Sequence, residues 1–177
     1  MTLNLGETRL EAVQGDITQQ EIDAVVNAAN SALAGGGGVD GAIHRAGGAS
    51  ILAECRQFKG GCPTGQARIT GAGDLRAKKI IHAVGPVWNG GGHGESELLC
   101  SAYRSSLQLA VENELRSIAF PSISTGAYRF PLEKASRIAV DTCKDFCSEN
   151  PGALDLIRFV CFSARDLKVY GKLLNPL

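Results

Sequence analysis

The chain has 177 residues, of which 44% are apolar and 20% are charged, a composition typical of a soluble globular protein with a sizeable core. Its 18 basic and 18 acidic residues give no net charge, so we expect neither nucleic acid nor an anionic membrane as a partner. No apolar run approaches the roughly 18 residues of a membrane span, and the first residues lack the regions of a signal peptide, so a cytoplasmic protein is expected.

Expected strands and helices alternate along the chain. In its first half, hydrophobic periodicity predicts a strand at 9–14, a helical turn at 19–22, a strand at 24–27, a helix at 39–58 broken near Gly47 and Gly48, and strands at 67–70 and 79–84. In its second half, the same criterion predicts a helix at 95–112, a strand at 117–120, a helix at 132–147 and a strand at 156–161. A closing helix is expected to include Leu167, Tyr170 and Leu174. Strands joined by helices of this length favour one α/β domain over residues 1–177, with a mixed, mostly parallel sheet covered by helices on both faces.

The most unusual stretch of the chain is residues 27–43. It follows a buried strand and contains four consecutive glycines at 35–38, whose backbone can approach a ligand closely. A helix is expected directly after the glycines, and free N–H groups at a helix start bind anions such as phosphate. Asn27, Asn30 and Asp40 add two amides and a carboxylate. The stretch therefore predicts a site where a group next to a phosphate reacts, with a flexible glycine connector as the alternative.

Two further motifs follow expected strands. Residues 15–17 follow the first strand, and residues 121–131 follow the strand at 117–120 and supply hydroxyls, a glycine and Tyr128. Because ligands of α/β sheets bind beyond the carboxyl ends of strands, we expect these loops and the glycine stretch to face one crevice, where two anion cradles suit a diphosphate. The glycine pattern matches neither a P-loop nor a dinucleotide-binding fingerprint.

Cysteines and histidines give no metal-binding pattern. None of the six cysteines forms a Cys-x-x-Cys pair or lies at finger spacing from a histidine, so no metal and no cofactor are expected. Cys143 and Cys147, one helical turn apart, are the alternative, but free cysteine commonly behaves as a small buried hydrophobe. His44 lies one turn after Asp40 and would form either an acid/base pair with it or, as we favour, a structural histidine bonded to nearby backbone. His82, inside an apolar strand, is expected to be a core histidine.

Taken together, five motifs resemble the macrodomain family, and most closely its MacroD-type branch of ADP-ribose hydrolases. The resemblance covers nearly the whole chain and includes Gly15-Asp16-Ile17, Asn27-Ala28-Ala29-Asn30, the run from Gly35 to His44, His82-Ala83-Val84-Gly85-Pro86 and Ile123-Ser124-Thr125-Gly126. It implies a three-layer α/β/α fold with a mixed sheet and an ADP-ribose cleft over the strand ends.

The resemblance also implies roles for single residues at the adenine end. Asp16 would accept a hydrogen bond from the exocyclic amine of adenine, and the Ile17 N–H would meet a ring nitrogen. Phe162, just past the last strand, would lie beside the adenine ring. The alternatives are a turn residue for Asp16 and an ordinary core residue for Phe162.

At the other end, the resemblance places the distal ribose and the diphosphate between the two cradles. Asn27, at the start of this stretch, would be one of the substrate-binding residues. One cradle would hold a phosphate and the distal ribose and consists of Gly36, Gly37, Gly38 and Val39. The other would hold the diphosphate and consists of Ser124, Thr125, Gly126 and Ala127. Tyr128 would pack against the distal ribose, Asn30 would bind ribose hydroxyls, and Asp40 would lie near the bond that is cut. Arg129 stands where many members of the family carry glycine.

The implied reaction is metal-independent hydrolysis of O-acetyl-ADP-ribose and of mono-ADP-ribose esterified to acidic side chains of proteins. Asp40 would orient or deprotonate a water, with a substrate phosphate as an alternative base, and Asn30 would fix the ribose. The expected partners are therefore ADP-ribose, its esters and ADP-ribosylated proteins, and a monomer is favoured. Two other functions fit the same cleft, namely a non-catalytic ADP-ribose reader and an ADP-ribose 1″-phosphate phosphatase.

Overall fold

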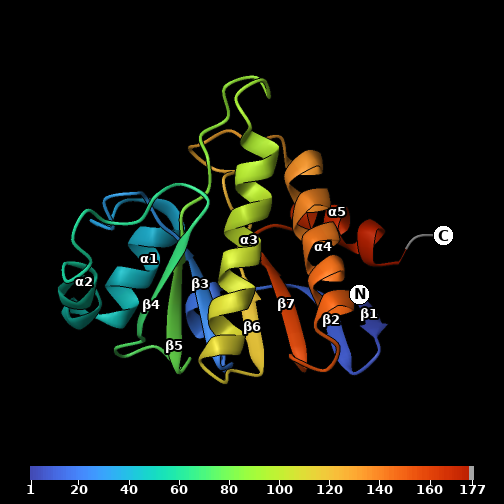
Figure 1. The fold of residues 1–177 in the computed structure, drawn as a ribbon, viewed down its shortest axis with the longest axis horizontal. Coiled ribbons are helices and arrows are strands. Elements are labelled where there is room, and N and C mark those ends of the chain that lie inside the picture. Colours follow the sequence, from blue (N-terminus) through green and yellow to red (C-terminus); the bar gives the residue numbers. More distant parts are fainter. Residues whose placement is uncertain (176–177) are drawn as a thin grey trace.

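A computed structural model describes residues 1–175. A seven-stranded sheet lies between two layers of helices (Figure 1). The strands are β1 (Thr2–Leu5), β2 (Thr8–Gln14), β3 (Ala24–Ala28), β4 (Ala67–Gly71), β5 (Lys79–Ala83), β6 (Ser117–Phe120) and β7 (Leu156–Cys161). The helices are the 3-10 turn η1 (Ile17–Gln19), α1 (Gly38–Gly47), α2 (Ala49–Cys55), α3 (Glu95–Glu112), α4 (Leu132–Glu149) and α5 (Ala164–Leu174).

The sheet is mixed and mostly parallel, in the order β1-β2-β7-β6-β3-β5-β4. The five strands from β2 to β5 in this order pair in parallel, and the two edge strands, β1 and β4, pair antiparallel to their neighbours. The carboxyl ends of the five parallel strands consequently meet at one edge of the sheet. The expected α/β/α architecture is confirmed.

Each face of the sheet carries its own core, because successive residues of a strand point to opposite faces. On β3, Val26 packs in the core under α3, α4 and α5, whereas Val25 packs in the core under α1 and α2. In the larger core the ring of Phe120 lies 4.9 Å from that of Tyr103 on α3, joining sheet and helix. Full burial of such side chains contributes about 1.5–3 kcal/mol each, so these contacts stabilise the sheet that carries the strand ends.

Most expected elements occur within a few residues of their predicted bounds. The expected helix at 39–58 is two helices, because Gly48 has φ 87° and adopts a left-handed conformation that favours glycine. The turn expected at 19–22 is η1 at Ile17–Gln19 instead, because Asp16 caps it. Strand β1 was not predicted. In the part of the chain that the structure describes, no helix has the length and apolar character needed to cross a membrane.

Candidate active site

The first part of the candidate site lies where β2 and β7 end. Gln14 pairs with Cys161 in parallel register, and Gly15 N donates to Cys161 O at 3.0 Å. This pairing places Asp16 and Phe162 on neighbouring strand ends. The Phe162 side chain is 90% exposed, so its alternative assignment to the core is wrong. An exposed aromatic ring beside a carboxylate can hold a base by stacking and by one hydrogen bond.

Asp16 is both exposed and locally fixed. Its Oδ1 accepts hydrogen bonds from Thr18 N at 2.8 Å and from Thr18 Oγ1 at 2.7 Å, which caps η1. Gln20 Nε2 donates to the Asp16 carbonyl oxygen at 2.9 Å, and the Ile17 side chain is buried. The turn assignment and the binding assignment of Asp16 are therefore compatible, because capping uses one carboxylate oxygen and leaves the side chain exposed.

The glycine stretch forms an open loop that ends at the start of α1. Gly37 is the N-cap residue of α1, and no side chain caps this end of the helix. Gly36, Gly37 and Gly38 are exposed and Val39 is half-buried. The N–H groups of the first turn are thus open, and the helix dipole adds partial positive charge there. This geometry suits an anion, and binding of an anion here stays a prediction.

Asn30 holds the glycine loop in shape. Its Nδ2 donates to Gly35 O at 2.9 Å, and its Oδ1 accepts from Ala34 N at 3.2 Å. A Cβ built on Gly36 would lie 3.4 Å from Asp40 Oδ2 and 3.7 Å from Asn30 Nδ2. The structure therefore brings Asn30, Gly36 and Asp40 together, and it gives Asn30 a supporting role that the sequence did not predict. Contact of Asn30 with ribose stays a prediction.

Asp40 is a nearly buried carboxylate in the first turn of α1. It is 6% exposed, and its Oδ1 accepts from Asn27 Nδ2 at 2.8 Å and lies 3.2 Å from His44 Nε2. The favoured assignment of His44 to a backbone contact is wrong, because the ring faces Asp40 one turn earlier on the same helix. The other ring nitrogen, Nδ1, is buried without a partner among the described residues.

The second cradle follows β6. Ser124 has φ 68°, and its Oγ is buried with no partner in residues 1–175. Its carbonyl oxygen accepts from Phe130 N at 2.9 Å, which closes the loop. Thr125 Oγ1 donates to Ser122 Oγ at 2.8 Å, whereas Gly126 and Ala127 are exposed. A buried hydroxyl without a partner beside exposed backbone is the arrangement expected of a loop that closes on a polar ligand.

Gly85 supports this cradle and was not given a role from the sequence. A Cβ on Gly85 would overlap Ser124 Oγ and would lie 2.6 Å from Ile123 Cγ2. The glycine after β5 is thus needed because the loop after β6 packs directly on it. In the sequence, the Gly85-Pro86 pair after a strand indicated a loop but not this contact. A contact with a residue 39 positions later in the chain produces no periodic pattern in the sequence.

Tyr128 and Arg129 complete the second loop. Tyr128 is half-buried, and its carbonyl oxygen accepts from Trp88 N at 2.8 Å. Arg129 is exposed with φ 62°, in the left-handed region that favours glycine. This backbone conformation gives a physical reason for the glycine that many members of the resembled family carry there.

Glu95 fixes the glycine-rich loop at residues 89–94, which rises above the sheet at the top of Figure 1. Its side chain is 1% exposed and accepts hydrogen bonds from the N–H groups of Asn89, Gly91 and His93 at 2.9, 2.8 and 2.6 Å. Burial raises the pKa of Glu95, but these backbone hydrogen bonds outweigh it and lower that pKa to about 2.

We expect Glu95→Gln to lower the melting temperature most above pH 4.5. A carboxylate with a depressed folded pKa contributes stability above its ordinary value of 4.5, and this contribution is lost as the pH falls toward about 2. The difference in melting temperature between parent and variant should therefore shrink over this range. Trp88, the single tryptophan, reports the loop by fluorescence. A difference that is independent of pH would contradict this assignment.

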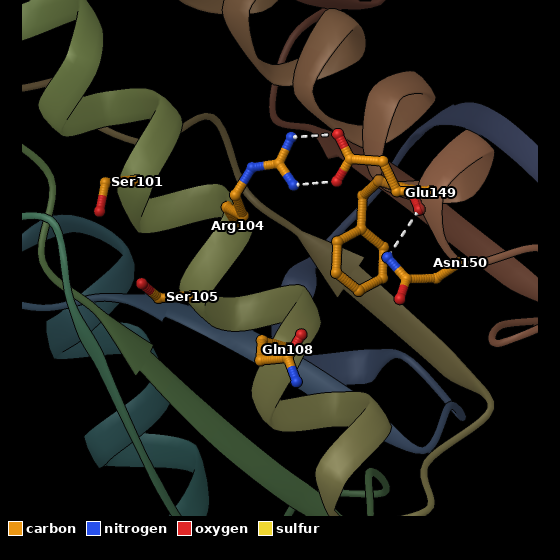
Figure 2. Close-up of a pocket in the computed structure, with 7 residues that line it drawn as sticks. Ser101, Arg104, Ser105, Gln108, Glu149 and Asn150 are labelled. Atoms are coloured by element: carbon orange, nitrogen blue, oxygen red, sulfur yellow. Dashed lines mark hydrogen bonds and ion pairs between the residues drawn. The ribbon is translucent and has the colours of Figure 1, made fainter.

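A hollow elsewhere on the molecule is lined by none of the predicted site residues. It lies between α3 and α4 (Figure 2), and its volume is about 490 Å³. Arg104 Nη1 there donates to Glu149 Oε2 at 2.6 Å, and the hydroxyls of Ser101 and Ser105 both donate to Gly65 O. These four side chains are thus already paired, and none of them belongs to the loops at the strand ends.

Metal-binding donors are not gathered in the described residues. Within residues 1–175, no group of three or more His, Cys, Asp or Glu side chains lies where it would hold a metal ion. Cys143 and Cys147 are buried on α4, and burial raises the pKa of both thiols. Both therefore stay protonated near neutral pH, which is unfavourable for binding a metal.

Comparison with known proteins gives a consistent result. A family model described as Macro domain matches residues 26–139. A Macro domain-containing protein of Caldanaerobacter subterraneus is 55% identical over 172 residues, 96% of this chain and 97% of that protein. A Salmonella gallinarum protein named O-acetyl-ADP-ribose deacetylase is 54% identical, with 95% of each chain covered. A mutant of the Oceanobacillus iheyensis macrodomain, solved with ADPR, has a TM-score of 0.92 at 41% identity, with 97% of this chain and 95% of that chain covered.

Proposed function

The chain belongs to the Macro domain family, and on that basis we propose that it binds ADP-ribose and hydrolyses esters of the distal ribose. The proposed substrates are O-acetyl-ADP-ribose and mono-ADP-ribose on acidic side chains of proteins. One observation carries the step from binding to hydrolysis. Asp40 is a nearly buried carboxylate at the open end of α1, beside Gly36 and Asn30. A carboxylate there weakens anion binding by repulsion, so its presence favours a chemical role.

Binding follows from the order of the loops along the sheet edge. The adenine lies between Asp16 and Phe162 at the ends of β2 and β7, with the Ile17 N–H on a ring nitrogen. The diphosphate lies between the cradle that begins at Gly36 and the cradle that begins at Ser124. The distal ribose lies beyond it, near Asn30, Asp40 and Tyr128. Support comes from the exposed Phe162, the open start of α1 and the unpartnered Ser124 hydroxyl.

Hydrolysis requires an activated water next to the ester. Asp40 orients this water and accepts its proton, with a substrate phosphate as the alternative acceptor, and Asn30 fixes the ribose. The water oxygen bonds to one carbon of the ester link, the bond from that carbon to the linking oxygen breaks, and the proton taken from the water passes to the departing oxygen. The products are ADP-ribose and a carboxylic acid. General-base assistance supplies about 10²–10⁴-fold, and positioning of the reactants adds to it. His44, 3.2 Å from Asp40 Oδ1, orients the carboxylate.

Parallel incubations test this proposal. The protein is incubated with O-acetyl-ADP-ribose, with a protein carrying ADP-ribosyl-glutamate and with ADP-ribose 1″-phosphate, each with and without excess EDTA. We expect turnover of the first two substrates, unchanged by EDTA. Binding of ADP-ribose without turnover of any substrate would make the protein a reader, and turnover of the phosphate ester alone would make it a phosphatase. Loss of turnover in EDTA, restored by a divalent metal, would refute metal independence.

We expect Asp16→Ala to weaken ADP-ribose binding by about tenfold to a hundredfold, because a lost hydrogen bond to a charged group costs about 1.5–3 kcal/mol. Asp16→Asn is the sharper variant, since its amide oxygen can still cap η1 while its NH₂ group faces the adenine amine. It should keep the melting temperature and shift preference toward an inosine analogue, whose ring presents a carbonyl. Calorimetry with both ligands measures this shift, and unchanged affinities in both variants would remove Asp16 from the site.

A further inference from the structure

A buried chain of polar side chains lies beneath Asp40. Asn27 on β3 is 0% exposed and pairs in register with His82 on β5, which is 1% exposed. Asn27 Nδ2 lies 2.8 Å from Asp40 Oδ1 and 3.1 Å from His82 Nδ1. On its other side, His82 Nε2 lies 2.9 Å from the hydroxyl of Thr70 on β4. Three neighbouring strands thus supply one continuous path of hydrogen bonds to Asp40.

The direction of these bonds determines which nitrogen of His82 carries the proton. An amide nitrogen only donates, so the two hydrogens of Asn27 Nδ2 go to Asp40 and to His82 Nδ1. His82 Nδ1 therefore accepts, and the ring proton is on Nε2, where it faces Thr70 Oγ1. The Thr70 hydroxyl donates onward to Gly71 O at 2.9 Å. Burial, and next the nearby His44, lower the pKa of His82 to about 4, so the ring is neutral near pH 7.

The amide of Asn27 is held only through its nitrogen. Asn27 Oδ1 is buried and has no partner among the described residues, so it does not fix the rotation of the amide. That rotation depends on two acceptors, the Asp40 carboxylate and His82 Nδ1. Without the acceptor on His82, one hydrogen of the Asn27 amide would be buried and unpaired, which is costly.

We propose that His82 is a positioning residue for Asp40 and that it acts through Asn27. Its neutral ring, with the proton on Nε2, accepts from Asn27 and so aims the Asn27 amide at the carboxylate that handles the water. This inference rests on the proposed hydrolysis and goes beyond the core role that the sequence predicts for His82. A mere core histidine fills space, whereas a positioning histidine must present an acceptor at one particular ring atom.

Two amide substitutions separate these roles, because each reproduces one side of the ring. In His82→Asn the amide oxygen takes the place of Nδ1 and keeps an acceptor for Asn27. In His82→Gln the amide reaches the place of Nε2, so it keeps a partner for Thr70 and loses the acceptor for Asn27. Both side chains are polar and fit a strand, so they form a matched pair. Melting temperatures report whether each variant is folded.

We expect His82→Asn to hydrolyse O-acetyl-ADP-ribose with a kcat within about threefold of the parent. His82→Gln should lose about tenfold or more in kcat, because small displacements of a catalytic group are costly, while KM and the Kd for ADP-ribose stay within about threefold. Equal loss in both variants, the reverse order, or parent rates in both would overturn the proposal. A core role alone predicts no such split between kcat and KM.

Nitrogen-15 NMR of the parent tests the same geometry without any reaction. The proposal requires a neutral His82 ring near pH 7 with its proton on Nε2 and with Nδ1 as an acceptor. A proton on Nδ1 would overturn it, even if both variants failed to fold. If the parent hydrolysed none of the esters, the proposed function would fail, while this measurement would still decide whether His82 holds Asn27.

Discussion

Asp40→Ala is expected to lower kcat for O-acetyl-ADP-ribose by about 10²-fold or more, because the group that handles the attacking water is lost. Binding of ADP-ribose should change little or tighten, since a negative charge beside the phosphates is removed. Steady-state kinetics and calorimetry on the same preparation measure the two effects. Separation of catalysis from binding is the result that distinguishes an enzyme from a reader.

Two control variants make this result specific. Asp40→Asn keeps the volume of the side chain and an oxygen that can accept from Asn27, so it should fold like the parent and still lose most of kcat. Asn30→Ala should instead weaken binding and turnover together, because its amide holds the glycine loop at Gly35 O and Ala34 N and would serve the ground state and the transition state alike. Parent rates in Asp40→Ala and Asn30→Ala would refute the catalytic assignment.

Gly85→Ala should distort the diphosphate cradle, although Gly85 is not itself part of that cradle. The added methyl group would overlap Ser124 Oγ and Ile123 Cγ2, and overpacking of this kind costs about 1–3 kcal/mol. Relief of the clash displaces the loop after β6, so we expect a lower melting temperature and a loss of about tenfold or more in ADP-ribose affinity.

Gly92→Ala is the matched control for Gly85→Ala. A Cβ at Gly92 meets no atom within 4 Å, and Gly92 lies outside both cradles. This variant should keep the parent melting temperature and affinity. Wild-type affinity in Gly85→Ala, measured by calorimetry, would show that the cradle does not depend on its contact with Gly85.

Hydrophobic periodicity predicted the elements whose pattern is local and strong. Helix α3 at Glu95–Glu112 and strand β7 at Leu156–Cys161 have the predicted bounds, because a long amphipathic helix and a short, mostly apolar run each leave a pattern in the local sequence. Strand β1 was missed because it has four residues, is half-exposed and gains its order by pairing with β2 at the edge of the sheet. Its own sequence therefore carries little of the information that makes it a strand.

For the site, sequence motifs showed which loops matter but not how they contact one another. The placement of Asp16, of Ser124 and of the loop that leads to Asp40 after strand ends followed from the expected parallel sheet. The contact between Asn27 and His82 depends instead on register across 55 residues, and the tight packing on Gly85 depends on a loop from another strand. Such contacts leave no local pattern, so they became visible only in the folded chain.

The order of the strands also sets the distance between the two ends of the proposed site, and this distance favours ligands that are long enough to reach both ends. From β2, which ends beside Asp16, to β3, which leads into the glycine loop, the sheet order has three steps, or about 14 Å at the usual spacing of about 4.8 Å. Under the proposed function, AMP reaches only the first end and ribose 5-phosphate only the second. A ligand that joins both halves makes its second contact intramolecularly, at an effective concentration of about millimolar or more. On this arrangement mononucleotides compete poorly with ADP-ribose, even though each would make correct contacts at its own end.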